Sequence, residues 1–123
     1  MLLTIPGQPR AWQRARICGK RFFRSEEQRA HQAAVIAAWV QAGRECEGTG
    51  PLRVLMSFYF AKPKSNKTLY PMHRNDLDNL AKEILDALNE RAFGDDGQVI
   101  ELHCVKEWCE AGKERTVIRI VKA

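Results

Sequence analysis

Four aspartates and one lysine in the second half of the chain have the side-chain types and spacing of a metal-dependent site. Asp76 and Asp78 flank a leucine where a helix is predicted to begin, and Asp95 and Asp96 lie in a later turn. Lys82 follows Asp78 by four residues, so the two side chains lie about 40° apart around a helix axis. If the strand after the turn pairs beside the start of the helix, three carboxylates converge. Such a group suits Mg²⁺, which takes one or two protein carboxylates, several waters and substrate phosphate oxygens.

Each of these features also has a purely structural interpretation. An aspartate at a helix start commonly caps the helix. An Asp–Lys pair four residues apart is commonly a surface ion pair worth about 0.3–0.5 kcal/mol. Asp-Asp-Gly is ordinary turn chemistry. Spacing alone leaves both interpretations open, and the joint occurrence of the three features beside a basic segment favours the metal site.

The charge is distributed unevenly along the chain, whose net charge is +5. Residues 1–74 contain 13 Lys and Arg against 4 Asp and Glu, whereas residues 75–110 contain 3 against 10. The basic part favours a polyanionic partner, because Lys and Arg that neutralise phosphates release condensed counterions. The acidic part would repel that partner unless a cation occupies it, and a divalent metal is the simplest candidate. An acidic helix solvated far from any partner is the alternative.

Length and composition predict one globular domain over residues 1–123. The chain is 45% hydrophobic and 28% charged, and its longest uncharged apolar run, Ala33–Val40, is too short to span a bilayer. The first residues lack the charged region and long apolar region of a secretory signal. Four cysteines without such a signal predict reduced thiols in a cytosol-like compartment, so we expect a cytoplasmic protein.

Local patterns predict alternating strands and helices. In chain order they are a strand at Leu2–Ile5, a basic hairpin of Ala15–Cys18 and Arg21–Arg24, a helix over about Glu26–Ala42, a strand at Leu52–Phe60, a helix over about Asp76–Arg91, and two strands at about Gln98–Glu107 and Arg115–Val121. This order predicts an α+β fold, a two-layer sandwich in which two helices pack on one face of a mixed β-sheet.

Helical periodicity predicts which side of each helix is buried. The first helix begins at a capping box, Ser25 to Gln28. Its apolar positions are Ala30, Ala33, Ala34, Ala37, Ala38 and Val40. The stripe predicted for the second helix is Leu77, Leu80, Ala81, Ile84 and Leu88. Trp39 and Met56 are expected in the core, and His31 is expected to be solvated or locally bonded.

Several segments together resemble one enzyme family. They are D-L-D-N-L-A-K with I-L-D-A-L-N, then F-G-D-D-G-Q-V-I, the opening I-P-G-Q-P, and K-P-K-S before the acidic motif. Over nearly the whole chain the sequence resembles the RusA family of Holliday-junction resolvases, which are common in phages and prophages. The resemblance implies a RusA-like fold and a homodimeric, Mg²⁺-dependent endonuclease of DNA recombination and repair that nicks four-way DNA junctions symmetrically.

The resemblance also implies roles for individual residues. Asp76 and Asp78 match the paired metal-binding aspartates of the family, and Asp96 matches the third. Lys82 matches the active-site lysine, and Asp95 matches a neighbouring acid with a secondary role. The catalytic set is therefore expected to be Asp76, Asp78, Asp96 and Lys82, with the three aspartates as metal ligands. The family often has an arginine run before the first aspartate, whereas this chain has a single arginine there, which bears on junction affinity.

Phosphodiester cleavage is the chemistry that such residues suit. It needs a water made nucleophilic near neutral pH and stabilisation of the charge on a pentacovalent phosphate, and Mg²⁺ or Mn²⁺ supplies both. Three ligands do not distinguish one ion from two. Lys82 is expected to stay protonated among the acids, which favours electrostatic stabilisation over a role as general base.

A basic hairpin and a basic loop are the expected contacts to branched double-stranded DNA. The DNA-binding residues predicted are Arg10, Arg14, Arg16, Lys20, Arg21, Lys62, Lys64, Lys67 and Arg74. The aromatic residues Trp12, Phe22 and Phe23 are interleaved with the hairpin's basic residues. They either stack on bases exposed at a branch point or pack in the core.

Other functions remain open at this level. A nuclease of the same fold that acts on flaps or other branched DNA, or a catalytically silent junction-binding module, would share these features. Zinc binding by His103, Cys104 and Cys109 is weakly indicated, because there is no C-x-x-C pair. The surfaces of the first helix and of the apolar strand are the expected dimer contacts.

Overall fold

The order of strands and helices predicted from the sequence is confirmed. The computed structural model describes residues 1–13, 16–18, 21–23, 25–72 and 75–123. They form β1 (Leu2–Pro6), β2 (Arg16–Cys18), β3 (Arg21–Phe23), α1 (Glu26–Gln41), β4 (Leu52–Ala61), α2 (Leu77–Leu88), the 3₁₀ helix η1 (Asp96–Gln98), β5 (Val99–Cys109) and β6 (Arg115–Lys122). The hairpin turn predicted at Gly19-Lys20 lies outside the described residues.

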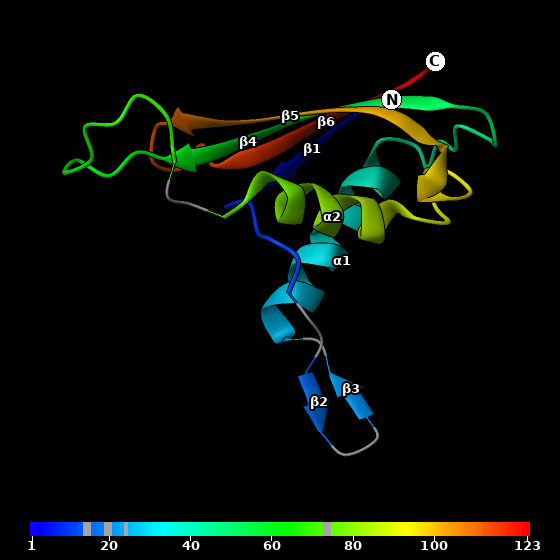
Figure 1. Cartoon of the computed structure of the whole chain (residues 1–123), viewed down its shortest axis with the longest axis horizontal. Helices are drawn as coiled ribbons and strands as arrows, with labels where there is room; N and C mark the ends of the chain where they lie inside the picture. Colours follow the sequence, from blue (N-terminus) through cyan, green and yellow to red (C-terminus); the bar gives the residue numbers. More distant parts are fainter. Residues whose placement is uncertain (14–15, 19–20, 24, 73–74) are drawn as a thin grey trace.

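Four of the strands form one mixed sheet in the order β1-β6-β4-β5. β4 is parallel to β5 and antiparallel to β6, which is also antiparallel to β1. Both helices lie on one side of this sheet, its inner face, and the β2–β3 hairpin projects away beyond α1 (Figure 1). The predicted α+β sandwich is therefore confirmed. Neither α1 nor α2, the helices of the described ranges, is long and apolar enough to cross a lipid bilayer.

The core lies between the inner face of the sheet and α2. Alternate residues of β4 are buried, as a strand with one covered face requires. They are Leu52, Val54, Met56, Phe58 and Phe60. From α2, Leu80, Ala81, Ile84, Ala87 and Leu88 are buried and Leu77 is half-buried. The stripe predicted for the second helix is thus confirmed, and it fixes which face of α2 remains in solvent. The helix ends at Leu88 because the next residue, Asn89, has φ of −59° and ψ of 136°, outside the helical range, and Glu90 then has a left-handed φ of 62°.

The prediction for the first helix is confirmed only at Ala38, which is buried, and in part at Ala34, which packs against the core. Ala30, Ala33 and Ala37 are exposed, whereas the buried residues of α1 are Gln28, His31, Val35 and Ala38. His31 is therefore neither solvated nor locally bonded, and Trp39 is half-buried. The reason is a polar partner on α2 that periodicity of apolar residues does not reveal.

That partner is Glu83, which is fully buried between the two helices. Its carboxylate accepts hydrogen bonds from Gln28 Nε2 at 3.3 Å and Gln32 Nε2 at 2.9 Å. His31 Nδ1 lies 3.1 Å from the other carboxylate oxygen and forms an ion pair with it when the imidazole is protonated. A buried carboxylate is tolerated only with such partners, so the cluster fixes how α2 packs on α1.

Replacing Glu83 by Ala should lower the free energy of unfolding by about 3 kcal/mol, because buried donors on Gln28 and His31 lose their acceptor. Urea denaturation followed by circular dichroism measures this change. Glu45→Ala, on an exposed loop residue, is the control and should stay within about 0.5 kcal/mol of the wild type. A loss from Glu83→Ala as small as that of the control would show that the cluster does not hold the helices together.

Candidate active site

The exposed face of α2 carries three charged residues at four-residue intervals. Because the opposite face is buried, Asp78, Lys82 and Asp86 lie along one line on the solvent side of the helix. Asp86 was missed by the sequence analysis, although its four-residue spacing from Lys82 was a usable signal. The three residues line a groove of about 350 Å³ between α2 and β5, together with Ala81, Leu85, Asp96 and Leu102.

Asp76 does not cap α2 with its side chain, and Asp78 is not paired with Lys82, so neither purely structural interpretation applies to these two aspartates. Asp76 occupies the N-cap position of α2 with extended backbone, but its side chain makes no capping hydrogen bond. Asp78 and Lys82 form no ion pair with each other, and Asp78 Oδ1 instead accepts the backbone N–H of Asn79 at 2.9 Å. Both carboxylates are exposed, so they retain lone pairs for a ligand.

Lys82 is positioned by an aromatic ring. Its Nζ lies 4.1 Å from the centre of the Trp12 ring, a cation–π contact. The segment that carries Trp12 is held on α2 because the backbone N–H of Trp12 donates to the backbone carbonyl of Asn79 at 2.9 Å. Trp12 was expected either to stack on bases or to pack in the core. It is half-buried, and it holds the Lys82 ammonium in place.

The turn before β5 separates the roles of its two aspartates. The Asp95 carboxylate accepts the Gly97 N–H at 3.0 Å and caps η1. A Cβ on Gly97 would lie 2.6 Å from Asp95 Oδ2, so this cap requires glycine. Gln98 Nε2 donates to the carbonyls of Gly48 and Gly50 at 2.9 and 2.8 Å, which braces the turn against a neighbouring loop. The Asp96 carboxylate is exposed and accepts no hydrogen bond from a described residue.

Asp78 and Asp96 lie near opposite ends of α2. The Asp96 N–H donates to Asn89 Oδ1 at 3.0 Å, just after the last residue of the helix. Asp78 is ten residues before Leu88, which is roughly 15 Å along the helix axis. The reason is the connection: β4 and β5 are parallel, so the chain must return along α2 before β5 begins. The condition under which the sequence analysis had the three carboxylates converge, a later strand that begins beside the helix start, is therefore not met.

The carboxylates accordingly form no ligand cluster within one chain. Across the described ranges, no group of three or more His, Cys, Asp or Glu side chains is placed to hold a metal ion. The donor chemistry nevertheless fits a hard cation, because the groove and its ends offer carboxylate oxygens without competing capping bonds. Mg²⁺ takes one or two protein carboxylates and completes its coordination with water. Metal binding by Asp76, Asp78 and Asp96 stays a prediction.

The zinc interpretation has little support from the strand geometry. His103 and Cys104 are consecutive residues of β5, so their side chains point to opposite faces of the sheet. Cys104 lies on the inner face, where burial raises the pKa of its thiol and favours the protonated form over the thiolate that binds metal.

The predicted DNA-binding residues are placed as follows. Lys62, Lys64 and Lys67 are exposed on the loop between β4 and α2. Arg10 is exposed and pairs with Glu27, with 3.3 Å between Nη1 and Oε2. Arg16 and Arg21 lie on the paired strands β2 and β3 of the projecting hairpin. Arg14, Lys20 and Arg74 lie outside the described residues, and the orientations of Phe22 and Phe23 are likewise not described.

Comparison with known proteins identifies the family. The profile described as endodeoxyribonuclease RusA matches residues 6–121. The chain belongs to the RusA endodeoxyribonuclease family. A second similarity is to the uncharacterized protein YqaN of Bacillus subtilis (strain 168), at 32% identity over 87 residues. That match covers 61% of this chain and 61% of YqaN.

The contrast between Asp95 and Asp96 generates a test of metal binding. Asp96→Asn should weaken Mn²⁺ binding at least about tenfold, because a ligand carboxylate becomes a neutral amide. Asp95→Asn should leave the affinity within about twofold, since asparagine caps as well as aspartate does. Isothermal titration calorimetry measures both affinities. Equal losses from the two variants would contradict the assignment of Asp96 as the ligand.

Proposed function

We propose that the protein is a Mg²⁺-dependent endonuclease that resolves four-way DNA junctions by paired, symmetrical phosphodiester hydrolysis. The observation that carries the proposal is one groove lined by the exposed carboxylates of Asp78 and Asp96 and by the positioned ammonium of Lys82, with the non-capping carboxylate of Asp76 at the start of the same helix, in a chain of the RusA family. Mn²⁺ is expected to replace Mg²⁺, because both accept oxygen ligands.

In this proposal the protein residues divide the work between holding the ion and stabilising charge. When bound, the ion supplies a water that ionises near neutral pH and a positive charge beside the reacting phosphate. Asp76, Asp78 and Asp96 hold the ion. Lys82 stands beside Asp78 on the same helix face, where its ammonium stabilises the charge that develops on the phosphate oxygens. Trp12 restricts Lys82 to this place.

The loop between β4 and α2 is the proposed guide for the DNA backbone. It carries the exposed Lys62, Lys64 and Lys67 and leads along the chain into the start of α2, where Asp76 lies. Trp108 Nε1 donates to the Thr68 carbonyl at 3.0 Å, and Thr68 Oγ1 contacts Asn66 Oδ1 at 2.6 Å. These bonds hold the loop in one shape, so its cations are presented to phosphates without a large ordering cost.

In a homodimer, carboxylates that are separated within one chain could form a metal site between the two protomers. A two-fold axis through the middle of the α2 groove sets Asp78 of one protomer beside Asp96 of the partner, and generates the same pair again on the other side. The dimer would then have two metal sites, as two nicks on a two-fold symmetric junction require. We propose that each site combines Asp76 and Asp78 of one chain with Asp96 of the other.

The surface around the groove is suited to this contact. β5 is an edge strand of the four-stranded sheet, so no strand of that sheet pairs with its outer backbone edge. On the same strand, the apolar side chains of Ile100 and Leu102 are 64% and 43% exposed. β4, the apolar strand expected to contribute, is paired on both edges and offers only its outer side-chain face. The geometry therefore favours α2 and β5 over the α1 and β4 surfaces expected from the sequence.

The wild type should convert a mobile four-way junction into nicked duplexes in Mg²⁺, with the two nicks at symmetry-related positions. Asp76→Asn or Asp96→Asn should reduce nicking by at least about 1,000-fold and leave junction binding intact or slightly tighter, because a negative charge is removed near phosphates. A gel assay at nucleotide resolution, with EDTA and Ca²⁺ arms, measures the cuts. Normal cutting by either variant would show that the site is misassigned.

The same assay separates the alternative functions. Faster cleavage of flap or fork substrates than of the four-way junction would favour a nuclease of other branched DNA. Binding without any cleavage in Mg²⁺ or Mn²⁺ would favour a silent junction-binding module.

Mixing inactive variants tests the shared site. If Asp78 and Asp96 act across the dimer, equilibrated Asp78→Asn and Asp96→Asn chains form heterodimers with one intact site, and nicking of a single strand should reappear. The matched control is a mixture of Asp78→Asn and Asp76→Asn, which both affect the same end of α2 and should not restore cutting. No recovery in the first mixture, once native mass spectrometry has shown heterodimers, would place the site within one chain.

A further inference from the structure

We infer that the pocket between the segment after β1 and the start of α1 binds one unpaired nucleobase of branched DNA, next to the phosphate that is cut. This inference rests on the proposed function, because it names how the same site reads its substrate. The pocket has a volume of about 280 Å³. Its polar lining consists of Gln8, Arg10, Gln13, Glu27, Gln28 and Asn75.

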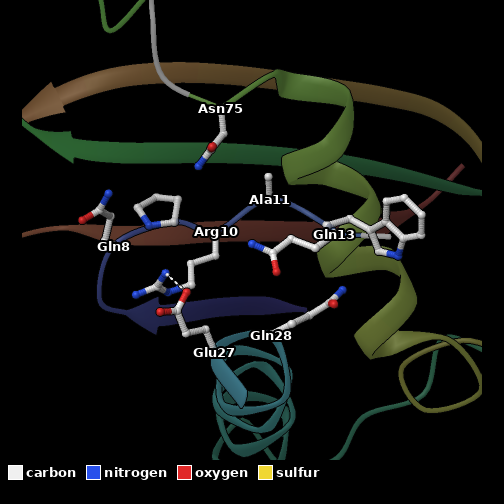
Figure 2. A pocket seen from close by; sticks show the side chains of 9 residues that line it. Gln8, Arg10, Ala11, Gln13, Glu27, Gln28 and Asn75 are labelled. Atoms are coloured by element: carbon white, nitrogen blue, oxygen red, sulfur yellow. Dashed lines mark hydrogen bonds and ion pairs between the residues drawn. The ribbon is translucent and has the colours of Figure 1, made fainter. Parts of the chain in front are cut away.

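The charge of the lining favours a base over a phosphate. Among the lining residues that the structure describes, Arg10 is the one cation, and its guanidinium is paired with Glu27 at 3.3 Å. The remaining polar side chains are neutral amides, each with donors and an acceptor. Amides of Gln and Asn match the paired donor and acceptor groups on base edges, which an isolated phosphate lacks. Figure 2 shows the amides of Gln13 and Asn75 reaching toward the same space from different segments.

Gln28 supplies a buried acceptor that needs a donor. The residue is 3% exposed, and its Oε1 has no hydrogen-bond partner in the part of the chain that the structure describes. Its Nε2 donates to the Glu83 carboxylate at 3.3 Å, and this contact fixes which end of the amide is oxygen. A buried carbonyl oxygen without a partner is costly, so a ligand N–H that reaches it gains affinity. Every unpaired base presents at least one ring or exocyclic N–H.

The pocket adjoins the proposed catalytic residues. Asn75 immediately precedes Asp76, and Trp12, which also lines the pocket, carries Lys82 on its ring at 4.1 Å. A nucleotide whose phosphate lies at Lys82 therefore has its base within reach of the pocket. A volume near the lower limit of small-molecule sites admits one ring system and excludes a base pair. The base must leave the stack to enter, and this is least costly at a branch point.

A double-mutant cycle between DNA and protein tests the inference without any cleavage. Junctions with one abasic site, placed in turn at each of the positions flanking the branch point, are titrated with protein in EDTA. For the wild type, one position should lose about tenfold in affinity, because a base in the pocket contributes stacking and hydrogen bonds. Gln13→Ala combined with Asn75→Ala, and Gln28→Met separately, should lose affinity for the intact junction and show no further loss at that abasic position.

Gln41→Ala is the control, because Gln41 is an exposed amide on α1 outside the pocket, and it should behave as the wild type. The exposed pair of Gln13 and Asn75 keeps the test valid if Gln28→Met fails to fold. If the affinity losses from the protein variant and from the abasic site add at every position, the inferred base pocket is contradicted, and the nuclease proposal is unaffected. Failure of the wild type to bind any branched DNA would instead contradict the proposed function.

Discussion

The parallel connection from β4 through α2 to β5 is the constraint on which the rest of the structure depends. Parallel strands force the chain to return along the whole length of a helix, so the turn that carries Asp96 follows the opposite end of α2 from Asp76 and Asp78. The burial of Leu80, Ile84 and Leu88 against the sheet then decides which face of α2 is free. Asp78 and Lys82 stand on that face, and the turn that carries Asp96 begins where the helix ends.

Polar contacts add to apolar packing in setting the position of this helix. The fully buried Glu83 ties α2 to Gln28, Gln32 and His31 of α1. At the other side of the helix, Trp12 accepts the Lys82 ammonium on its ring. The residues after β1 and those of α1 thus determine the geometry of a functional group that they do not themselves carry. Gln28 belongs to the Glu83 cluster and also lines the proposed base pocket. Its amide nitrogen donates to Glu83, and its amide oxygen has no partner among the described residues.

The sequence predicted the order of the elements correctly, because those signals are local, and its assignment of site residues stays a prediction. The alternation of β4 and the stripe of α2 are visible in residue periodicity, and both were confirmed. The face of α1 was mostly mispredicted because an alanine-rich helix has little apolar contrast, and its buried residues are selected by a distant carboxylate. The choice of Asp96 over Asp95 as a metal ligand followed from the family resemblance and stays a prediction; in the structure Asp95 caps η1 and the Asp96 carboxylate is exposed. The relative placement of Asp78 and Asp96 depends on the strand pairing, which no local pattern contains.

We have proposed that carboxylates from opposite ends of α2 share a divalent ion across a two-fold axis. The most direct measurement is anomalous diffraction from crystals of the protein bound to a four-way junction in Mn²⁺. The account predicts an anomalous peak within ligand distance of Asp76 or Asp78 of one protomer and of Asp96 of its partner. A peak held by other side chains, or full occupancy by Mn²⁺ with Asp96 of both protomers facing solvent, would contradict it.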